Sequence, residues 1–185
     1  MKNPEFIIFT GPMFGSKTTK MLSVLERCSY QNKKVTAFKP KMDDRYSEGE
    51  ICTHAGLRYS ATNINSGEEM LARSIGYDVI GVDEAFMIDG SAEALISLYR
   101  QGKTIVVSSI QMSASGNVFS EIKEILPWAT KIEVCPAVCV KTGDNAYYTV
   151  RKIENLAEIE VGGADMYEPR AWAETPFVND LYDGD

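Results

Sequence analysis

Short apolar runs alternate along the first 135 residues with stretches in which apolar residues recur at helical spacing. Five runs are too short for helices and are bounded by glycine, proline or polar residues, so each predicts a strand. They are residues 6–9, 34–38, 78–82, 104–110 and 131–134. Helices are predicted after Lys17, over 66–76, over 91–100 and over 119–126. This alternation predicts an α/β fold, with a parallel sheet and helices on both of its faces.

The pattern changes beyond Cys135. Two strand-like pieces, residues 146–153 and 158–161, precede the pair Gly162-Gly163, and the chain ends in acidic residues. We therefore expect an α/β domain over residues 1–134, a small β lid domain over 135–175 that closes over the edge of the sheet, and an acidic tail over 176–185.

The segment after the first strand, GPMFGSKT at residues 11–18, has the composition of a phosphate-binding loop. In such loops the backbone N–H groups and the N-terminus of the following helix face the phosphates of a nucleotide. Lys17 would reach the β- and γ-phosphate oxygens, and the hydroxyl of Thr18 would bind Mg²⁺. The alternative is an ordinary strand, turn and helix with a lysine on the surface.

The glycine order of this loop departs from the pattern G-x-x-x-x-G-K-[ST]. The first glycine is Gly11, but the residue before Lys17 is Ser16, and the second glycine stands one place earlier, at Gly15. The position before the lysine packs against the phosphates and often needs a backbone conformation that a Cβ penalises. We therefore expect Ser16 to weaken or alter ATP binding.

The strand at 78–82 leads into two consecutive acids, Asp83 and Glu84. Ligands of open parallel sheets bind at the carboxyl ends of the strands, so both acids should share an edge with the phosphate loop. Asp83 is placed to hold Mg²⁺ through water, which leaves Glu84 to act as a general base toward a second substrate. The alternative is a helix N-cap, because a helix is predicted soon afterwards.

The overall composition excludes several classes of partner. The 185 residues carry a net charge of −7, which disfavours nucleic acid polymers and anionic membranes because both attract basic surfaces. An apolar share of 44% and a charged share of 24% are ordinary for globular proteins, so small-molecule chemistry is favoured. No apolar span of about 18 residues occurs, and MKNPEF is no secretion signal. We expect a cytoplasmic protein with reduced cysteines.

Seven motifs follow one another along the chain. They are GPMF with Lys17-Thr18, DDRYS at 43–47, CTH at 52–54, IGVDEA at 80–85, AVC at 137–139, AYYTVR at 146–151 and GGADMYEPR at 162–170. Together they resemble the type II thymidine kinase family of small P-loop kinases. The resemblance implies a P-loop NTPase-like sheet with a lid or lasso domain, and transfer of the γ-phosphate of ATP to the 5′-hydroxyl of thymidine, giving dTMP. It also implies Mg²⁺ as cofactor and a homotetramer.

The resemblance further implies roles for individual residues. Glu84 matches the general base, and Lys17, Thr18 and Asp83 match residues that hold phosphates and Mg²⁺. The ATP site would comprise Gly11, Pro12, Met13, Phe14, Gly15, Ser16, Lys17, Thr18, Asp83 and Arg45. The nucleoside site would comprise Met13, Met87, Ile110, Ala114, Phe119, Thr149, Arg151, Gly162, Gly163 and Tyr167. Solvated charges, surface aromatics or core residues are the alternative roles, and His54 is expected to be structural.

The chain departs from the family where most members hold a structural zinc on two Cys-x-x-Cys pairs. Here the four positions are Cys139, Thr142, Ala171 and Glu174. Cys135 could add one thiolate, but a structural Zn²⁺ needs four nitrogen or sulfur ligands. We therefore expect no zinc.

Two further departures lie in the expected active site. Phe86 stands two places after Glu84, where the family commonly has glutamine, and Ala114 replaces a phenylalanine that would wall the base pocket. Two hypotheses remain open: an ATP-dependent kinase of thymidine or a close pyrimidine analogue, and a degenerate homologue that binds nucleotide without catalysis. A generic P-loop ATPase is a third, against which the GGADMY segment argues.

Overall fold

The computed structural model describes residues 3–42, 49–53, 56–152 and 162–179. Arg45, His54 and the strand predicted at 158–161 lie outside these described residues. Within them, six parallel strands form the central sheet, in the order β5-β2-β6-β7-β1-β8. The strands are β1 (Phe6–Thr10), β2 (Val35–Pro40), β5 (Thr62–Ile64), β6 (Val79–Asp83), β7 (Thr104–Ser108) and β8 (Lys131–Val134).

The predicted α/β fold is confirmed, since all five predicted strands belong to this sheet. The sixth, β5, was not predicted because TNI is short and half polar. β7 lies between β1 and β6, with Ile8 opposite Val107 on one side and Val82 opposite Val107 on the other. Consequently the loop that follows β1 and the acids that close β6 flank the end of β7.

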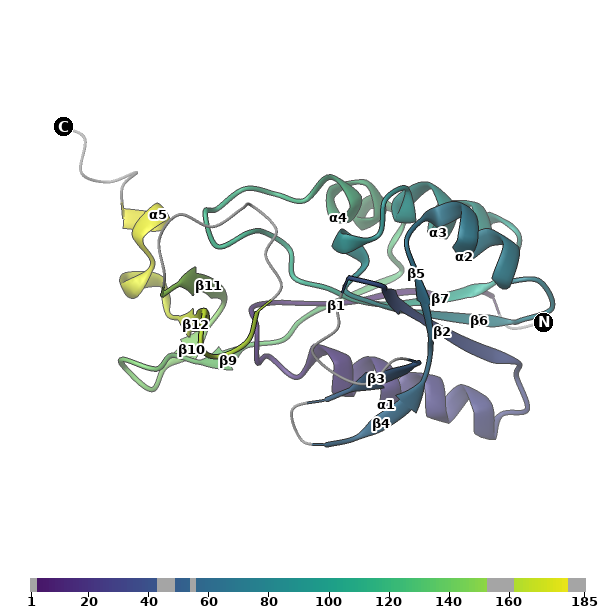
Figure 1. Cartoon of the computed structure of the whole chain (residues 1–185), viewed down its shortest axis with the longest axis horizontal. Helices are drawn as coiled ribbons and strands as arrows, with labels where there is room; N and C mark the ends of the chain where they lie inside the picture. Colours follow the sequence, from purple (N-terminus) through teal and green to yellow (C-terminus); the bar gives the residue numbers. More distant parts are fainter. Residues whose placement is uncertain (1–2, 43–48, 54–55, 153–161, 180–185) are drawn as a thin grey trace.

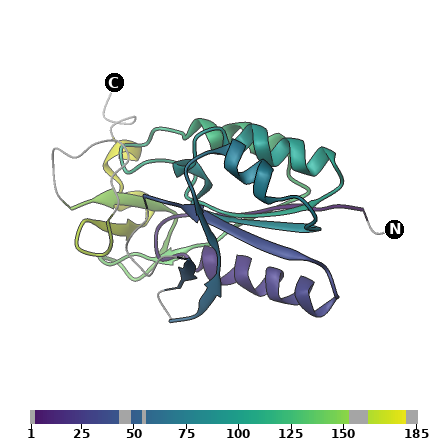
Figure 2. The ribbon, with the colours of Figure 1, turned by 45° about the vertical axis from the view of Figure 1, so that its right-hand side comes forward.

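Helices cover both faces of the sheet, as Figures 1 and 2 show from two directions. On one face lies α1 (Lys17–Tyr30); on the other lie α2 (Gly67–Arg73), α3 (Ser91–Arg100) and α4 (Ser120–Ile125). Alternate residues of β1 serve the two faces: Phe6 and Ile8 join the core beneath α2, α3 and α4, whereas Ile7 and Phe9 join the core against α1. Strands buried on both sides therefore read as continuous apolar runs.

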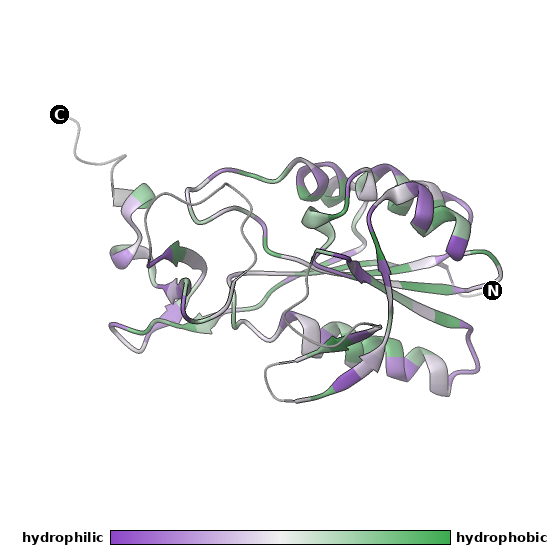
Figure 3. Cartoon of the chain, in the orientation of Figure 1, coloured by the Kyte–Doolittle hydropathy of each residue, from purple (hydrophilic) through white to green (hydrophobic). Residues whose placement is uncertain are grey.

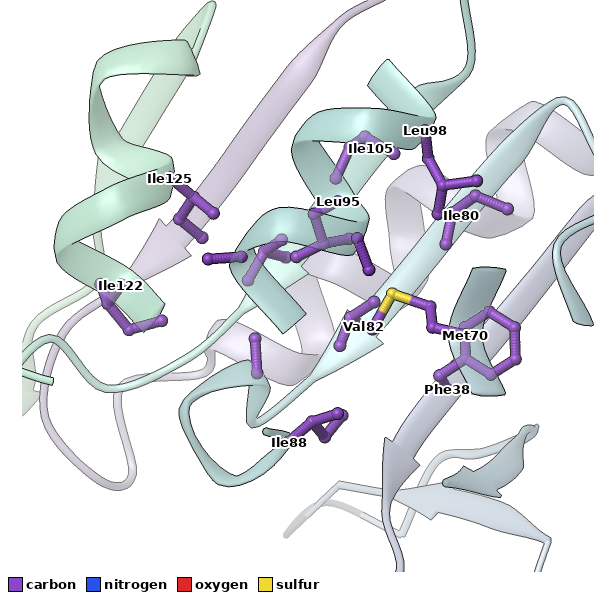
Figure 4. Close-up of a cluster of buried hydrophobic side chains, with 14 of the residues drawn as sticks. Phe38, Met70, Ile80, Val82, Ile88, Leu95, Leu98, Ile105, Ile122 and Ile125 are labelled. Atoms are coloured by element: carbon purple, nitrogen blue, oxygen red, sulfur yellow. The ribbon is translucent and has the colours of Figure 1, made fainter. Parts of the chain in front are cut away.

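The larger core fills the space between the sheet and α2, α3 and α4 (Figure 4). Leu95 of α3 and Ile80 of β6 are both fully buried there, and burial of such a side chain contributes about 2 kcal/mol. Figure 3 shows apolar residues along the strands and on the sides of the helices that face them. This packing holds β6 and β7, whose ends form the candidate site, in a fixed position.

Two antiparallel pairs follow the sheet and form what we call the C-terminal lobe. They are β9 (Ala137–Val138) with β10 (Asn145–Ala146), and β11 (Tyr148–Arg151) with β12 (Tyr167–Arg170). The strand predicted at 146–153 is thus divided at Tyr147, and β12 was not predicted. The lobe lies at one end of the sheet (Figure 1). A separate hairpin of β3 (Glu50–Cys52) and β4 (Arg58–Ser60) lies on the α1 side.

Short helices complete the described chain. They are η1 (Ala85–Met87), η2 (Leu126–Trp128), η3 (Trp172–Glu174) and α5 (Pro176–Asn179). α5 occupies the start of the expected acidic tail, and the ring of Phe177 lies 5.8 Å from that of Tyr148 in an edge-on contact. None of the helices in the described ranges is long and apolar enough to cross a membrane.

Candidate active site

The loop between β1 and α1 packs against the main chain at Cys135. At both Gly11 and Gly15, an added Cβ would overlap the carbonyl oxygen of Cys135. Gly11 also has a φ of +133°, which side chains other than glycine rarely adopt. The N–H of Gly15 donates a 3.3 Å hydrogen bond to the carbonyl of Pro12. The close approach of two backbone segments therefore explains why glycine stands at position 15.

Ser16 has a left-handed backbone, with φ +59° and ψ +20°, immediately before α1 begins. This is the conformation for which the usual loop pattern places glycine, and an L-residue there costs about 1 kcal/mol. The conformational demand expected at this position is thus present, and a serine meets it. The effect of Ser16 on ATP binding stays a prediction.

Lys17 and Thr18 are the first two residues of α1. The ammonium of Lys17 donates a 2.6 Å hydrogen bond to the carbonyl of Pro12, and its side chain is buried inside the loop. The hydroxyl of Thr18 donates a 3.1 Å hydrogen bond to Oδ1 of Asp83. The loop after β1 and the acid at the end of β6 therefore come together, as the sequence predicted.

Asp83 is the last residue of β6 and is buried. Burial raises the pKa of its carboxyl to about 7, and the neighbouring Glu84 contributes to the rise. The hydroxyls of Ser108 and Thr18 and the charge of Lys17 act in the opposite direction. These donors and the cation limit the rise, but burial outweighs them, so the pKa of the carboxyl stays above its ordinary value of 3.8.

Glu84 leaves the sheet through a left-handed turn, with φ +49°. Its N–H donates a 2.7 Å hydrogen bond to the carbonyl of Ser108, which fixes the turn. Its side chain makes no capping hydrogen bond to η1, and the residue that precedes α3 is Gly90. The helix-cap alternative for this acid pair is therefore not supported, and the strained turn is of the kind that clusters at active sites.

The C-terminal lobe contacts the phosphate loop through a hydrogen bond and an apolar contact that the sequence did not reveal. The N–H of Met13 donates a 3.0 Å bond to the buried hydroxyl of Thr149 in β11. Phe14 packs against the small apolar cluster of the lobe, formed by Ala137, Cys139 and Ala146. The resemblance named Thr149 as pocket lining, but its contact with the loop depends on tertiary structure and has no local sequence signal.

The residues expected around the nucleoside divide into two groups. In the lobe, Tyr167 is buried opposite Arg151, and the N–H groups of Met166 and Tyr167 both donate to the carbonyl of Gly163, at 3.2 and 3.0 Å. An added Cβ at Gly162 would meet the sulfur of Met166, which lies at the end of a flexible side chain. The second group, Met87, Ile110 and Phe119, packs with the larger core.

The centroid of the Phe119 ring lies 4.3 Å from that of the Phe86 ring. Both rings belong to the larger core and both are buried. Ala114 lies half-buried in the loop after β7. Phe86, at a position where the resemblance leads one to expect glutamine, therefore has a packing role of its own.

Magnesium fits the donors that meet at the edge of the sheet. The Thr18 hydroxyl and the Asp83 carboxylate supply oxygen, the ligand type that Mg²⁺ prefers. The backbone of the loop and the Lys17 ammonium supply the groups that a triphosphate needs beside it.

The residues at the positions where the resemblance would place zinc ligands have other contacts in this structure. The Glu174 carboxylate is 2.8 Å from the Lys141 ammonium and 3.5 Å from the Arg170 guanidinium, and Ala171 has no donor atom. Burial acts to raise the pKa of the Cys139 thiol, but hydrogen bonds from Thr142 and from backbone N–H groups outweigh it and lower that pKa to about 7. In the part of the chain that the structure describes, no three His, Cys, Asp or Glu side chains gather as a metal site.

Comparison with known proteins gives a consistent result. The sequence model of the thymidine kinase family matches residues 5–172. The chain is 37% identical over 176 residues to a thymidine kinase of Thermococcus kodakarensis, an alignment that covers 88% of this chain and 89% of that protein. It is 30% identical over 163 residues to a thymidine kinase of Bacteroides thetaiotaomicron, with 88% and 82% covered. A Rhodothermus thymidine kinase is 29% identical over 164 residues, with 88% and 77% covered.

Proposed function

We propose that this chain, which belongs to the thymidine kinase family, transfers the γ-phosphate of ATP to the 5′-hydroxyl of thymidine at the edge of the sheet where β1, β6 and β7 end. The protein is thus a thymidine kinase, a phosphotransferase. The observation that carries the assignment of the site is the 3.1 Å hydrogen bond from Thr18 to Asp83, because it joins the two halves of a nucleotide site across 65 positions of sequence.

The general base of the proposal is Glu84. It directly follows the buried Asp83, and its left-handed turn carries it out of the strand at the edge of the sheet. As the 5′-oxygen forms its bond to the γ-phosphorus, Glu84 accepts the hydroxyl proton, and the bond from that phosphorus to the bridging oxygen breaks to release ADP. A positioned base of this kind contributes about 10²- to 10⁴-fold to a reaction rate.

The phosphates are proposed to lie over the loop of residues 11–16, with Lys17 as their principal cation. Mg²⁺, held by Thr18 and by Asp83 through water, would supply charge neutralisation of the transferred group. From the lobe, the half-buried Arg151 is proposed to face the same phosphates. Arg45, assigned a similar role by the resemblance, lies outside the described residues.

The nucleoside is proposed to bind between the lobe and the loops that follow β6 and β7. Tyr167 and the Gly162-Gly163 turn would cover the base, and Met13 and Thr149, which are hydrogen-bonded to each other, would line one side. Met87, Ile110, Ala114 and Phe119 would line the other. The packing of Phe119 against Phe86 supports a rigid wall at that side.

Ion pairs in place of zinc are proposed to join the two turns of the lobe. Lys141 and Arg170 both approach the Glu174 carboxylate, and Arg170 also pairs with Glu168. These charges connect the segment around Cys139 to the segment after β12, which is the connection that a metal would otherwise make. The homotetramer implied by the resemblance is a further proposal, which light scattering of the purified protein would test.

The experiment that tests the function is a phosphoryl-transfer assay with ATP, Mg²⁺ and a panel of pyrimidine nucleosides, run beside a titration of ATP binding. Formation of dTMP and ADP in equal amounts is expected. The departures at Ser16, Phe86 and Ala114 favour a degenerate binder as the second candidate. ATP binding without any nucleoside phosphorylation would establish that second candidate, and failure to bind ATP would refute both.

A further inference from the structure

Ser108 is a fully buried serine at the end of an apolar strand, TIVVS, where the other buried residues are mostly aliphatic. Removing a hydroxyl from water costs free energy unless its hydrogen bonds are replaced within the protein. β7 lies between β1 and β6, so Ser108 ends its strand between the phosphate loop and the acid pair. Its register partner across the sheet is Asp83.

The contacts of Ser108 are with the groups assigned to phosphoryl transfer. Its Oγ lies 3.4 Å from the Oγ1 of Thr18, and its hydroxyl acts to lower the pKa of the Asp83 carboxyl. Its carbonyl accepts the 2.7 Å hydrogen bond from the N–H of Glu84. One buried residue thus lies beside both proposed metal ligands, contacting Thr18 through its side chain and pairing with Asp83 in the sheet. It also contacts the proposed base through its backbone.

The neighbouring residue provides an internal comparison. Ser109 is equally buried, but its hydroxyl donates a 3.2 Å hydrogen bond to the carbonyl of Ile110, and its N–H donates to the carbonyl of Phe9. Ser108 and Ser109 are therefore equally buried but differ in the partners of their hydroxyl groups. Of the two hydroxyls, the one of Ser108 faces Thr18, with 3.4 Å between the two oxygens.

We propose that Ser108 is a positioning residue for the metal site, and that its hydroxyl holds the Asp83 carboxylate and the Thr18 hydroxyl in the orientation in which both serve Mg²⁺. This inference rests on the proposed function. When the oxygen of Thr18 faces a cation, its proton must point away toward an acceptor, and Asp83 and Ser108 are the acceptors within reach. Because Ser108 pairs with Asp83 in the sheet, its hydroxyl is also placed to orient that carboxylate toward the metal.

Residues that orient metal ligands in this way affect the affinity for the metal more than the stability of the fold, and their loss weakens metal binding by about 10- to 100-fold. Replacement of Ser108 by alanine removes one oxygen and leaves the strand and its backbone hydrogen bonds unchanged. The Glu84 N–H keeps its acceptor, because that acceptor is the main-chain carbonyl of residue 108. The variant therefore isolates the role of the hydroxyl.

The test measures Mn²⁺ affinity directly, by electron paramagnetic resonance of free Mn²⁺ in the presence of ADP, for the full chain and its Ser108→Ala and Ser109→Ala variants. We expect about a tenfold loss of Mn²⁺ affinity in Ser108→Ala, with ADP affinity in the absence of metal and the melting temperature close to wild type. In Ser109→Ala, Mn²⁺ affinity should stay within about twofold of wild type. Should Ser108→Ala fail to fold, Ser108→Cys, which keeps nearly the same volume with a weak donor, carries the same expectation.

Equal losses in both alanine variants would overturn the inference, because they would indicate a packing effect shared by the two serines. Unchanged Mn²⁺ affinity in Ser108→Ala would overturn it as well. If the wild-type protein showed no ADP-dependent Mn²⁺ site, the proposed metal ligands themselves would be wrong. The binding measurement on the wild type thus separates failure of the proposed function from failure of the role given to Ser108.

Discussion

Gly15 lies so close to Cys135 that a Cβ on the glycine would overlap the carbonyl oxygen of the cysteine. The next residue, Ser16, has the left-handed backbone that favours glycine. In this loop, therefore, Gly15 stands where two backbone segments meet, whereas Ser16, like Phe14, has a left-handed backbone. The exchanged order of the two residues leads to opposite expectations for their substitution.

Ser16→Gly should stabilise the protein slightly. Relief of the left-handed conformation contributes about 1 kcal/mol, which exceeds the roughly 0.5 kcal/mol lost because glycine makes the unfolded chain more flexible. Urea unfolding would measure the gain, and ATP titration would show whether the relaxed loop also binds nucleotide more tightly. A destabilised Ser16→Gly protein would contradict this account of the loop.

Gly15→Ser is the substitution that matches Ser16→Gly, and it should destabilise the protein and weaken ATP binding. The serine Cβ would displace the main chain at Cys135, and overpacking of this kind costs about 2 kcal/mol. The expected result is a lower urea midpoint together with weaker ATP binding. Tolerance of this variant would mean that the loop and residue 135 separate more easily than the structure indicates.

Thr149→Val should weaken ATP binding in the absence of any nucleoside. The variant keeps the shape of the side chain but leaves the N–H of Met13 without its acceptor, at a cost of about 1 kcal/mol or about a fivefold loss of affinity. Thr149→Ser, which keeps the hydroxyl, is the control and should bind ATP nearly as well as the wild type. Unaltered ATP affinity in the valine variant would show that the lobe does not support the loop.

The raised pKa of Asp83 predicts a pH-dependent stability without added metal. Its ordinary pKa is 3.8, and burial raises the folded-state value to about 7. Between these values the folded protein binds a proton that the unfolded chain has released, so the free energy of unfolding should fall as pH rises across this interval. Asp83→Asn should remove that part of the fall, as measured by urea unfolding at several pH values.

Glu133→Gln is the control for this measurement. Hydrogen bonds from Lys20 and Lys131 lower the pKa of Glu133, so its stabilising contribution is present above its ordinary value of 4.5 and is lost only at lower pH. The stability difference between this variant and the wild type should change little from about pH 6 to about pH 8. An Asp83→Asn difference that is equally flat would show that Asp83 is ionised throughout.

The ion pairs of the lobe predict resistance to chelators. Exhaustive treatment with EDTA should leave the melting temperature of the protein unchanged, whereas Lys141→Met should lower it and reduce its dependence on salt. Arg58→Met breaks a similar 2.8 Å pair with Glu50 in the β3–β4 hairpin and controls for the loss of any surface charge. Zinc bound in equal amount to the purified protein, or a fall in melting temperature after chelation, would contradict the proposal.

The sequence predicted the sheet well because parallel strands that are buried on both faces appear in the sequence as continuous apolar runs. The runs FIIFT and VIGVD are apolar on both faces, and the acid or glycine after each marks the edge where ligands bind. The lobe was harder, since β9 and β10 span only two residues each and owe their pairing to the chain between them and to Phe14. Their formation depends on tertiary contacts, which carry no periodic signal.

The candidate site likewise contains residues that the sequence identifies and residues that only the fold brings to it. Lys17, Thr18, Asp83 and Glu84 could be named because they occupy fixed places relative to strands and a helix. Ser108 was missed because a serine at the end of an apolar strand resembles any polar boundary, and only the order of the strands brings it between the loop and the acids. The packing of Gly15 on Cys135 likewise joins residues 120 positions apart and could not be read from either segment.

The central claim is that Glu84 is the base of a thymidine kinase, and rapid-quench measurement of the phosphoryl-transfer step in wild type and Glu84→Gln tests it most directly. The account predicts that the variant binds ATP and thymidine with near wild-type affinity but transfers phosphate at least about 100-fold more slowly. A variant that binds both substrates and transfers phosphate at the wild-type rate would contradict the assignment of Glu84.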